Sequence, residues 1–350
     1  MFNPTLPASN YTDPAVFAHE WHALFPNTWQ FVARRDELPQ TPGSYLATTV
    51  LDEPVLLVRD AGGALLAMSN VCRHRAGPVA IGSGVRHSFS CAYHGWTYSL
   101  EGGLRACPEF EVAEIPAAQR QLPRYEAVEW GPWVFVRLGG GIAFDEWLGE
   151  MIEETEAYRL AELRFERRMS YALHCNWKVY IENYLEPYHL PVVHPALHRM
   201  TDYQRYQVEC RQWHVRQIGP PRPSSESSEI PLGGSGSESA AWYWAFPNFI
   251  LNCSFGLVST NLVIPTGPSS CDLVCDFFVP PDADPAAIEE AIALSHAIQL
   301  EDVTICEAVQ RGLESASYRG GILHPTREVG VAHFGKLWAD GMEVGGTGPL

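Results

Sequence analysis

The sequence predicts an α+β protein with two domains, an antiparallel β domain followed by a mixed domain that contains a large antiparallel sheet. Three observations support this prediction. The chain has 350 residues, 46% of them hydrophobic, which is enough for about two cores. Up to residue 140, short apolar or alternating runs stand between glycine-rich turns. Beyond that point, helix signals alternate with strand signals.

A short helix is predicted near the start of the chain. Asp13 is a helix cap and Pro14 suits the first turn, and apolar residues through Leu24 follow at helical spacing. A Pro-Asn pair at residues 26–27 ends the pattern. We therefore expect residues 1–28 to form an N-terminal helical segment.

Residues 29–140 have the pattern of an antiparallel β domain. Apolar or alternating runs at 45–50 and 55–58 predict strands, and glycine pairs at 62–63 and 102–103 predict tight turns between strands. A run of three glycines closes the pattern near residue 140. The composition therefore changes from β domain to second domain at this point.

Residues 141–350 form the second predicted domain, and Asp145 is expected to cap its first helix. Further elements are expected as a helix over 176–187, strand-like runs over 249–263 and 271–279, and a long helix that Asp284 and Pro285 open.

Residues 219–239 are rich in Gly, Pro, Ser and Glu and have almost no bulky apolar side chain. Such a segment cannot bury enough surface to order itself, so a mobile loop is predicted. It is either an insertion without function or a lid over a pocket.

Composition and charge exclude several classes of function. A formal charge of −17 argues against nucleic acid as a partner, because the chain would repel a phosphate backbone. No apolar stretch approaches the roughly 20 residues of a membrane helix, and no signal segment opens the sequence. Nine scattered cysteines do not make a disulfide framework. We therefore expect no membrane association, a cytoplasmic location, and cysteines that fill the core or bind metal.

Two Cys-His pairs stand in the β domain. Cys72 and His74 are separated by one residue, and Cys91 and His94 by two. Two thiolates on one iron and two neutral imidazoles on the other hold a [2Fe–2S] cluster, and the histidines raise its reduction potential. The pairs therefore predict a one-electron carrier site.

A structural zinc site is the alternative for the same four residues, because Cys₂His₂ sets also bind zinc. Zinc sites more often pair cysteine with cysteine and histidine with histidine, whereas each short loop here mixes the two types. This spacing favours the cluster. Iron colour and acid-labile sulfide distinguish the two interpretations.

A second set of candidate ligands lies in the second domain. Pro187 breaks the predicted helix just before His189, and His194 follows five residues later. Two histidines and one carboxylate on one face leave non-haem iron(II) with open positions for dioxygen and substrate. The carboxylate must come from elsewhere in the chain, and the acidic pair Glu301 and Asp302 in the long predicted helix is the best candidate.

Both sets of residues resemble one known family. Residues 70–75 (NVCRHR) and 91–96 (CAYHGW) resemble the cluster loops of Rieske non-haem iron oxygenase α subunits, the aromatic-ring-hydroxylating dioxygenase family. Residues 310–313 (QRGL), after the acidic pair, are similar to the ligand-bearing helix of that family. The resemblance runs from about residue 5 to 335. It departs at Ala92, where the family usually has proline, but this position is not a ligand.

The resemblance implies the fold, the cofactors and the partners. The fold would be an all-β Rieske [2Fe–2S] domain and a helix-grip catalytic domain of the START/Bet v1-like type, against which residues 1–28 pack. The cofactors would be the Rieske cluster and a mononuclear Fe(II), with Asp302 as the third iron ligand and Glu301 as the alternative ligand. The partners would be a small-molecule substrate, O₂ and an NAD(P)H-dependent reductase or a ferredoxin.

The resemblance also assigns Glu186 and Asn183 to the catalytic machinery. The family keeps an acidic residue that bridges the iron-binding histidine, here His189, to a cluster histidine, here His94, of the neighbouring subunit. In ring-dihydroxylating members this acidic residue is Asp, and the loop between it and the preceding Asn is one residue longer than the loop between Asn183 and Glu186. The extra methylene of Glu compensates for the shorter loop. A homotrimer in which Glu186 couples the two iron sites is the resulting hypothesis.

The substrate is predicted from a narrower resemblance. Residues 5–7, 11–14 and 183–186 look most like the choline, carnitine and glycine-betaine oxygenase branch, whose members hydroxylate or demethylate quaternary amines. A cation–π cage could come from Trp242, Tyr243, Trp244, Phe246 and Phe249, although these residues also suit a buried core strand.

Two other functions stay open at this point. One is an oxygenase for an aromatic ring or aromatic acid, since fold does not determine substrate. The other is a Rieske electron carrier without oxygenase activity. Regiochemistry, and the choice between mono- and dioxygenation, do not follow from the sequence.

Overall fold

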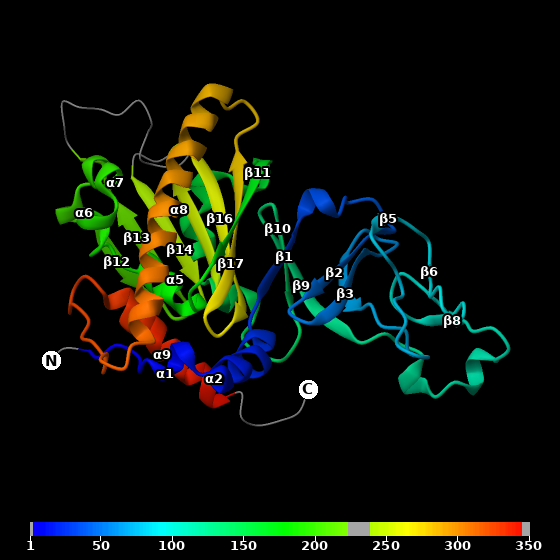
Figure 1. Cartoon of the computed structure of the whole chain (residues 1–350). Helices are drawn as coiled ribbons and strands as arrows, with labels where there is room; N and C mark the ends of the chain where they lie inside the picture. Colours follow the sequence, from blue (N-terminus) through cyan, green and yellow to red (C-terminus); the bar gives the residue numbers. More distant parts are fainter. Residues whose placement is uncertain (1–2, 223–238, 345–350) are drawn as a thin grey trace. The chain divides into compact units, whose positions relative to one another are not determined.

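A computed structural model describes residues 3–222 and 239–344, and the chain divides into two compact units (Figure 1). One unit consists of Met1–Leu24 with Ile142–Leu350, and the other of Phe25–Gly141. Most of the loop predicted at 219–239 therefore lies outside the described residues. Within the described ranges, no helix combines the length and apolar character needed to span a membrane.

The unit Phe25–Gly141 consists of two antiparallel sheets. The larger has the order β1-β10-β9-β4-β3-β2-β5, and the smaller has the order β6-β7-β8. The strands are β1 (Gln30–Arg34), β2 (Ser44–Val50), β3 (Glu53–Arg59), β4 (Leu65–Ser69), β5 (Ser83–Val85), β6 (Phe89–Ser90), β7 (Thr97–Tyr98), β8 (Leu104–Ala106), β9 (Arg124–Trp130) and β10 (Trp133–Arg137). Short 3-10 turns are η2 (Phe25–Asn27), η3 (Arg35–Glu37), η4 (Val112–Glu114) and η5 (Ala117–Gln119).

Glycine turns connect these strands where the sequence predicts them. Gly63 and Gly102 have φ angles of +85° and +81°, in the left-handed region that favours glycine. A Cβ on Gly102 would lie 2.9 Å from Nε2 of Gln121 and 3.0 Å from Sδ of Met68. Gly102 is therefore required both by its backbone angle and by the lack of space.

The second unit contains one large antiparallel sheet with the order β11-β17-β16-β15-β14-β13-β12. Its strands are β11 (Arg164–Leu173), β12 (Gln207–Cys210), β13 (His214–Gly219), β14 (Ala240–Ala245), β15 (Phe249–Ser254), β16 (Leu257–Gly267) and β17 (Ser270–Val279). Its α-helices are α1 (Ser9–Thr12), α2 (Pro14–His19), α3 (Phe144–Leu148), α4 (Met151–Glu154), α5 (Trp177–Tyr184), α6 (Leu190–Val193), α7 (Pro195–Met200), α8 (Pro285–Leu313) and α9 (Val329–Val344). The π-helix η1 (Glu20–Leu24) and the 3-10 turns η6 (Glu156–Tyr158), η7 (Leu160–Glu162) and η8 (Tyr203–Arg205) complete it.

Helix α8 has 29 residues and lies across this sheet (Figure 1). The side chain of Asp284 caps it by accepting a hydrogen bond from the backbone N–H of Ala286 at 3.4 Å. Asp13 caps α2 in the same way through Ala15 at 2.8 Å. Both Asp-Pro starts predicted from the sequence therefore begin helices.

Two predicted helix boundaries are wrong. Asp145 does not cap its helix, because α3 begins at Phe144 and its N-cap is Ala143. Gly149 then adopts a φ of +51° and ends α3, so a second helix, α4, begins two residues later. The helix predicted over 176–187 ends at Tyr184, because Pro187 lacks an N–H and its ring would clash with the carbonyl four residues earlier.

A buried ion pair anchors helix α5. The side chains of Lys178 and Glu20 are fully buried and paired, and Glu20 also accepts hydrogen bonds from the indole N–H groups of Trp177 at 2.9 Å and Trp338 at 2.6 Å. Burial lowers the pKa of Lys178, although Glu20 opposes this effect. The ion pair joins α5 to η1 and α9.

Removing Glu20 should destabilise the protein strongly. In Glu20→Ala the Lys178 ammonium is left buried without a partner, so we expect a loss of about 3–5 kcal/mol in the free energy of unfolding. Urea unfolding followed by circular dichroism measures this loss. The double variant Glu20→Leu with Lys178→Met should recover most of it, and Glu290→Ala, on the exposed start of α8, is the control. A Glu20→Ala variant as stable as this control would contradict the assignment.

Candidate iron sites and substrate pocket

The four predicted cluster ligands lie on two similar loops. Cys72 and His74 are in the loop from β4 to β5, and Cys91 and His94 are in the loop from β6 to β7. In each loop the backbone N–H of the cysteine donates to the carbonyl of the residue five positions later, at 2.8 Å in the first loop and 2.9 Å in the second. The two loops therefore present their Cys-His pairs on equivalent turns.

The side chains of these loops fit a group that needs two sulfur and two nitrogen donors. The thiols of Cys72 and Cys91 are in contact, and the rings of His74 and His94 have centroids 4.6 Å apart. The Nδ1 atom of His74 is buried and has no hydrogen-bond partner among the described residues. Two thiols and two imidazoles, one of them with an unpartnered buried nitrogen, are the donor set that a Rieske cluster requires.

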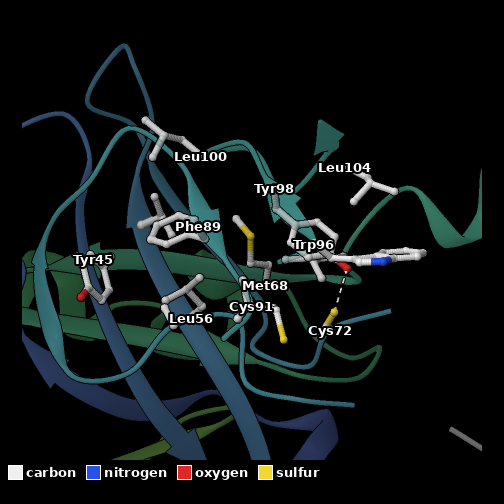
Figure 2. Packing of buried hydrophobic residues seen from close by; sticks show 14 of the residues in the cluster. Tyr45, Leu56, Met68, Cys72, Phe89, Cys91, Trp96, Tyr98, Leu100 and Leu104 are labelled. Atoms are coloured by element: carbon white, nitrogen blue, oxygen red, sulfur yellow. Dashed lines mark hydrogen bonds between the residues drawn. The ribbon is translucent and has the colours of Figure 1, made fainter. Parts of the chain in front are cut away.

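Packing around the loops holds the donors in place (Figure 2). The hydroxyl of Tyr98 lies 3.3 Å from Sγ of Cys72 and accepts a hydrogen bond from the backbone N–H of Arg73. The Trp96 ring stacks on His74 with centroids 5.0 Å apart and an interplanar angle of 6°. Burial raises the pKa of the Cys91 thiol, whereas neighbouring backbone N–H groups lower it.

The second set of predicted ligands comes from three separate places in the chain. His189 precedes α6, His194 lies between α6 and α7, and Asp302 lies in α8. The Oδ1 atom of Asp302 is 2.9 Å from Nε2 of His194 and 3.9 Å from Nε2 of His189. One donor atom from each of the three residues lies within 4.8 Å of the others. Two imidazoles and one carboxylate at this spacing fit a divalent metal with open positions.

A carboxylate holds the outer nitrogen of each histidine. His189 Nδ1 lies 2.7 Å from Glu186 Oε1, and His194 Nδ1 lies 2.7 Å from Glu301 Oε2. Each carboxylate accepts a hydrogen bond from Nδ1–H, so Nε2 is the nitrogen that remains to bind a metal, which is how carboxylates orient metal-binding histidines. Glu186 also accepts hydrogen bonds from the backbone N–H groups of Tyr188 and His189.

The geometry separates the roles of the two neighbouring acids in α8. Glu301 contacts the outer nitrogen of His194, whereas Asp302 faces the inner nitrogens of both histidines. Asn183 donates a hydrogen bond to Oδ1 of Asp302 at 2.7 Å and so fixes this carboxylate. Burial alone would lower the pKa of His194, but Asp302 and Glu301 outweigh it and the pKa is raised. The carboxylates therefore favour a positive charge at this place.

A pocket opens directly beside this centre, with an empty volume of about 690 Å³, its open mouth included. Its walls come from α5 to α8, the segment before β12, and strands β13 to β16. The residues that line it are Asn183, Tyr184, Glu186, His189, Leu190, His194, Leu197, Tyr206, Gln217, Trp242, Asn252, Ser254, Phe255, Leu257, Ser259, Ser295, Ile298, Gln299 and Asp302.

The predicted aromatic cage is wrong for four of its five members, because only Trp242 lines the pocket. Strand β14 is buried throughout, and its residues alternate between the two faces of the sheet. Trp244 packs against Phe334, with ring centroids 5.6 Å apart, and Phe249 packs against Trp147 at 6.2 Å. The core-strand alternative therefore holds for the rest of this run.

Sequence patterns did not indicate the partner of Trp242 or most of the polar lining. Tyr206 stacks on Trp242 with centroids 5.8 Å apart and an interplanar angle of 16°. Asn252 and Gln299 also line the pocket. Asn252 follows three apolar residues in a strand that is buried throughout, and a polar residue at such a position is the signal that could have indicated it. No sequence signal places Tyr206 opposite Trp242.

Comparison with known families identifies the class of protein. Residues 28–123 match the Rieske [2Fe-2S] domain, and residues 160–344 match the family described as ring hydroxylating alpha subunit (catalytic domain). The chain therefore belongs to the family of Rieske-type ring-hydroxylating oxygenase α subunits. The predicted fold class, the oxygenase activity and the two cofactors, a Rieske cluster and a mononuclear iron, are confirmed. The alternative of an electron carrier without oxygenase activity is excluded.

Two of the similar curated proteins are monooxygenases named for choline and carnitine. Choline monooxygenase, chloroplastic, of Beta vulgaris is 33% identical over 342 residues, which is 94% of this chain and 75% of that protein. The carnitine monooxygenase oxygenase subunit of Escherichia coli (strain K12) is 28% identical over 360 residues, which is 96% of this chain and 93% of that protein.

Solved structures of Rieske oxygenases have the same fold as this chain. The quaternary ammonium Rieske monooxygenase CntA, in complex with an inhibitor, has a TM-score of 0.84 and 25% identity, covering 97% of this chain and 96% of that one. Naphthalene 1,2-dioxygenase from Rhodococcus sp., bound to indole, has a TM-score of 0.76 and 19% identity, covering 97% and 94%. This second likeness extends to the fold alone.

Iron content should distinguish Asp302 from Glu301. Asp302→Asn removes the carboxylate that faces both histidines, so most of the mononuclear iron should be lost. Glu301→Gln removes only a support of His194, so iron affinity should fall by about 10–100-fold. Iron per chain, with acid-labile sulfide as the internal count of the intact cluster, measures both. Retention of iron in Asp302→Asn with loss in Glu301→Gln would reverse the assignment.

Proposed function

We propose that this chain is the oxygenase component of a multicomponent enzyme that hydroxylates or N-demethylates a quaternary ammonium compound. The observation that carries the proposal is the character of the pocket beside His189, His194 and Asp302. Tyr206 and Trp242 form an aromatic wall of the kind that binds a quaternary ammonium group, and no lysine or arginine is present among the described residues that line the pocket.

The relatives support this substrate class. Choline and carnitine, after which the curated relatives are named, are both quaternary ammonium compounds. A further crystal structure of CntA is a complex with its substrate L-carnitine. An aromatic substrate has weaker support, because the solved structure named for one, naphthalene 1,2-dioxygenase, is 19% identical and similar in fold alone.

In this proposal the cluster is held by Cys72, His74, Cys91 and His94, and the mononuclear iron(II) by His189, His194 and Asp302. When bound, the cluster supplies single electrons, and the iron supplies open positions for dioxygen beside the substrate.

The residues around the ligands then have defined tasks. Asn183 fixes the carboxylate of Asp302, and Glu301 fixes the ring of His194 in the tautomer whose Nε2 has a free lone pair. Leu190, Leu197 and Ile298 line the pocket near these ligands and limit the access of water to the reacting carbon.

The enzyme also needs an electron donor and a second copy of itself. We propose an NAD(P)H-dependent reductase or a ferredoxin as the donor, and a homotrimer in which Glu186 connects His189 to the partner subunit's His94. Large apolar side chains are exposed beside both groups, Tyr93 at 54% next to His94 and Tyr188 at 53% next to His189. Exposed apolar surface at both ends of the proposed electron path fits an interface between copies.

Oxygen uptake should test the substrate class. With NADH and a reductase that reduces the cluster, choline, carnitine or glycine betaine should stimulate oxygen uptake and benzoate should not. Trp242→Leu should raise the KM for the cation by about tenfold, since a desolvated cation–π contact contributes on the order of 1–2 kcal/mol. Trp130→Leu, in the other unit, is the matched control. Stimulation by benzoate and by no quaternary ammonium compound would defeat the proposal.

Glu186→Gln should separate iron binding from electron transfer. Gln can still accept a hydrogen bond from Nδ1 of His189, but iron affinity should fall as in Glu301→Gln, so both variants are assayed with excess Fe(II). Turnover per bound iron should then fall by about 100-fold in Glu186→Gln and much less in Glu301→Gln. Stopped-flow absorbance should show that the reduced cluster is reoxidised correspondingly slowly with substrate and oxygen present. Reoxidation at the wild-type rate would rule out Glu186 as the link between subunits.

A further inference from the structure

The pocket has a polar wall that the iron centre does not use. It is formed by Asn252 on β15, Ser259 on β16 and Gln299 on α8, and all three side chains line the pocket. Asn252 and Ser259 are buried, with exposed fractions of 8% and 4%. Buried amides and hydroxyls in an apolar sheet are costly unless their hydrogen bonds are satisfied, so the arrangement of these bonds decides what the wall offers to a ligand.

One chain of hydrogen bonds orients the amides of this wall. The hydroxyl of Tyr184 has two acceptors in reach, and it donates to the nearer one, Oδ1 of Asn252 at 2.9 Å, in preference to the carbonyl of Tyr243 at 3.3 Å. Nδ2 of Asn252 then donates to Oδ1 of Asn261 at 3.1 Å. Nδ2 of Asn261 then donates to the hydroxyl of Tyr180 at 3.1 Å, and this hydroxyl donates to Oε1 of Gln299 at 2.6 Å. Each donor in the chain determines the direction of the next bond. The carbonyl of Gln299 is therefore occupied, and its amide N–H groups are the atoms left for the pocket.

Ser259 adds a second donor to the same wall. Its Oγ accepts a hydrogen bond from Nδ2 of Asn252 at 3.1 Å, which leaves its own O–H free to donate. The wall therefore offers neutral N–H and O–H donors to an oxygen of the bound substrate. An oxygen-free cation would leave these donors unpaired, which costs roughly 1–3 kcal/mol for a buried group.

The charges of the pocket decide which kind of oxygen fits. No lysine or arginine is present among the described residues that line it, and its acidic members are Glu186 and Asp302. The sequence of residues 223–238, which lie outside the described ranges, also contains neither basic residue. In the iron-loaded enzyme the metal offsets the charge of Asp302, but a carboxylate held against this wall would still lose its hydration without a cationic side chain to pair with. A hydroxyl oxygen accepts the same hydrogen bonds without that cost.

We propose that Gln299, positioned by Tyr180, determines specificity: it donates a hydrogen bond to the hydroxyl oxygen of a quaternary ammonium alcohol, and the pocket discriminates against quaternary ammonium carboxylates. This inference rests on the proposed function. The proposed function includes quaternary ammonium alcohols and quaternary ammonium carboxylates, and this inference limits the substrate to the alcohols.

Isothermal titration of the anaerobic, iron-loaded holoenzyme tests this inference without a redox partner. The ligands are choline, propyltrimethylammonium as its oxygen-free analogue, glycine betaine and carnitine. Choline should bind about tenfold more tightly than each of the other three, the size of one hydrogen bond or one unfavourable charge. Equal or tighter binding of glycine betaine or carnitine would overturn the discrimination.

Substitutions test the residues. Gln299→Leu should weaken choline about tenfold and leave propyltrimethylammonium within about twofold of wild type. Tyr180→Phe, which removes the group that orients Gln299, should act in the same direction by a smaller factor. Thr304→Val, on the exposed side of α8, is the control that should change neither. Equal losses for choline and propyltrimethylammonium in Gln299→Leu would mean general damage to the pocket and would overturn the role of Gln299.

Failure of the proposed function has a separate signature. In that case none of the four ligands would bind to the wild-type holoenzyme, whereas benzoate would. Binding of propyltrimethylammonium as tight as that of choline would instead retain the quaternary ammonium class and overturn only the hydrogen bond from Gln299.

Discussion

The hydrogen bond from Asn183 to Asp302 is the contact on which the proposed iron centre of the larger unit depends. It joins the end of α5 to the middle of α8, two helices that are far apart in the sequence, at the carboxylate that faces both histidines. Helix α5 must end where it does for this to work. Because the chain leaves the helix at Leu185, Glu186 and His189 turn back toward α8 instead of continuing along the helix axis.

Helix α5 is itself held by buried charge. The pair of Lys178 and Glu20, with two indole N–H groups donating to the carboxylate, connects the first turn of α5 to the N-terminal segment and to α9. Such a pair contributes little net stability, but it is costly to break, and it allows one arrangement of its partners. The position of Asn183 on the same helix is therefore determined from both ends, by this ion pair and by α8.

The same principle extends to the histidines and to the substrate pocket. Each imidazole has a carboxylate on its outer nitrogen, and each amide of the polar wall has its direction set by a neighbour. The pocket thus combines rigid polar groups, an aromatic pair and acidic residues around one centre. Membership of the family does not by itself indicate the substrate, because the relatives are named for substrates as different as choline and naphthalene. The combination of groups in the pocket is what indicates a class of substrate for this chain.

The sequence by itself determined what depends on short spacing. The two Cys-His pairs, the histidines after the break in α5 and the Asp-Pro helix starts are local, since the residues of each lie within one turn or loop. Only the tertiary structure showed that Asp302, and not Glu301, faces both histidines, because neighbouring residues on a helix point about 100° apart and the packing of α8 on the sheet sets its rotation. It likewise placed Tyr206 on Trp242 and removed four aromatic residues from the predicted cage. Those contacts join strands to segments and helices far from them in the sequence, so they follow only from the whole sheet and what packs on it.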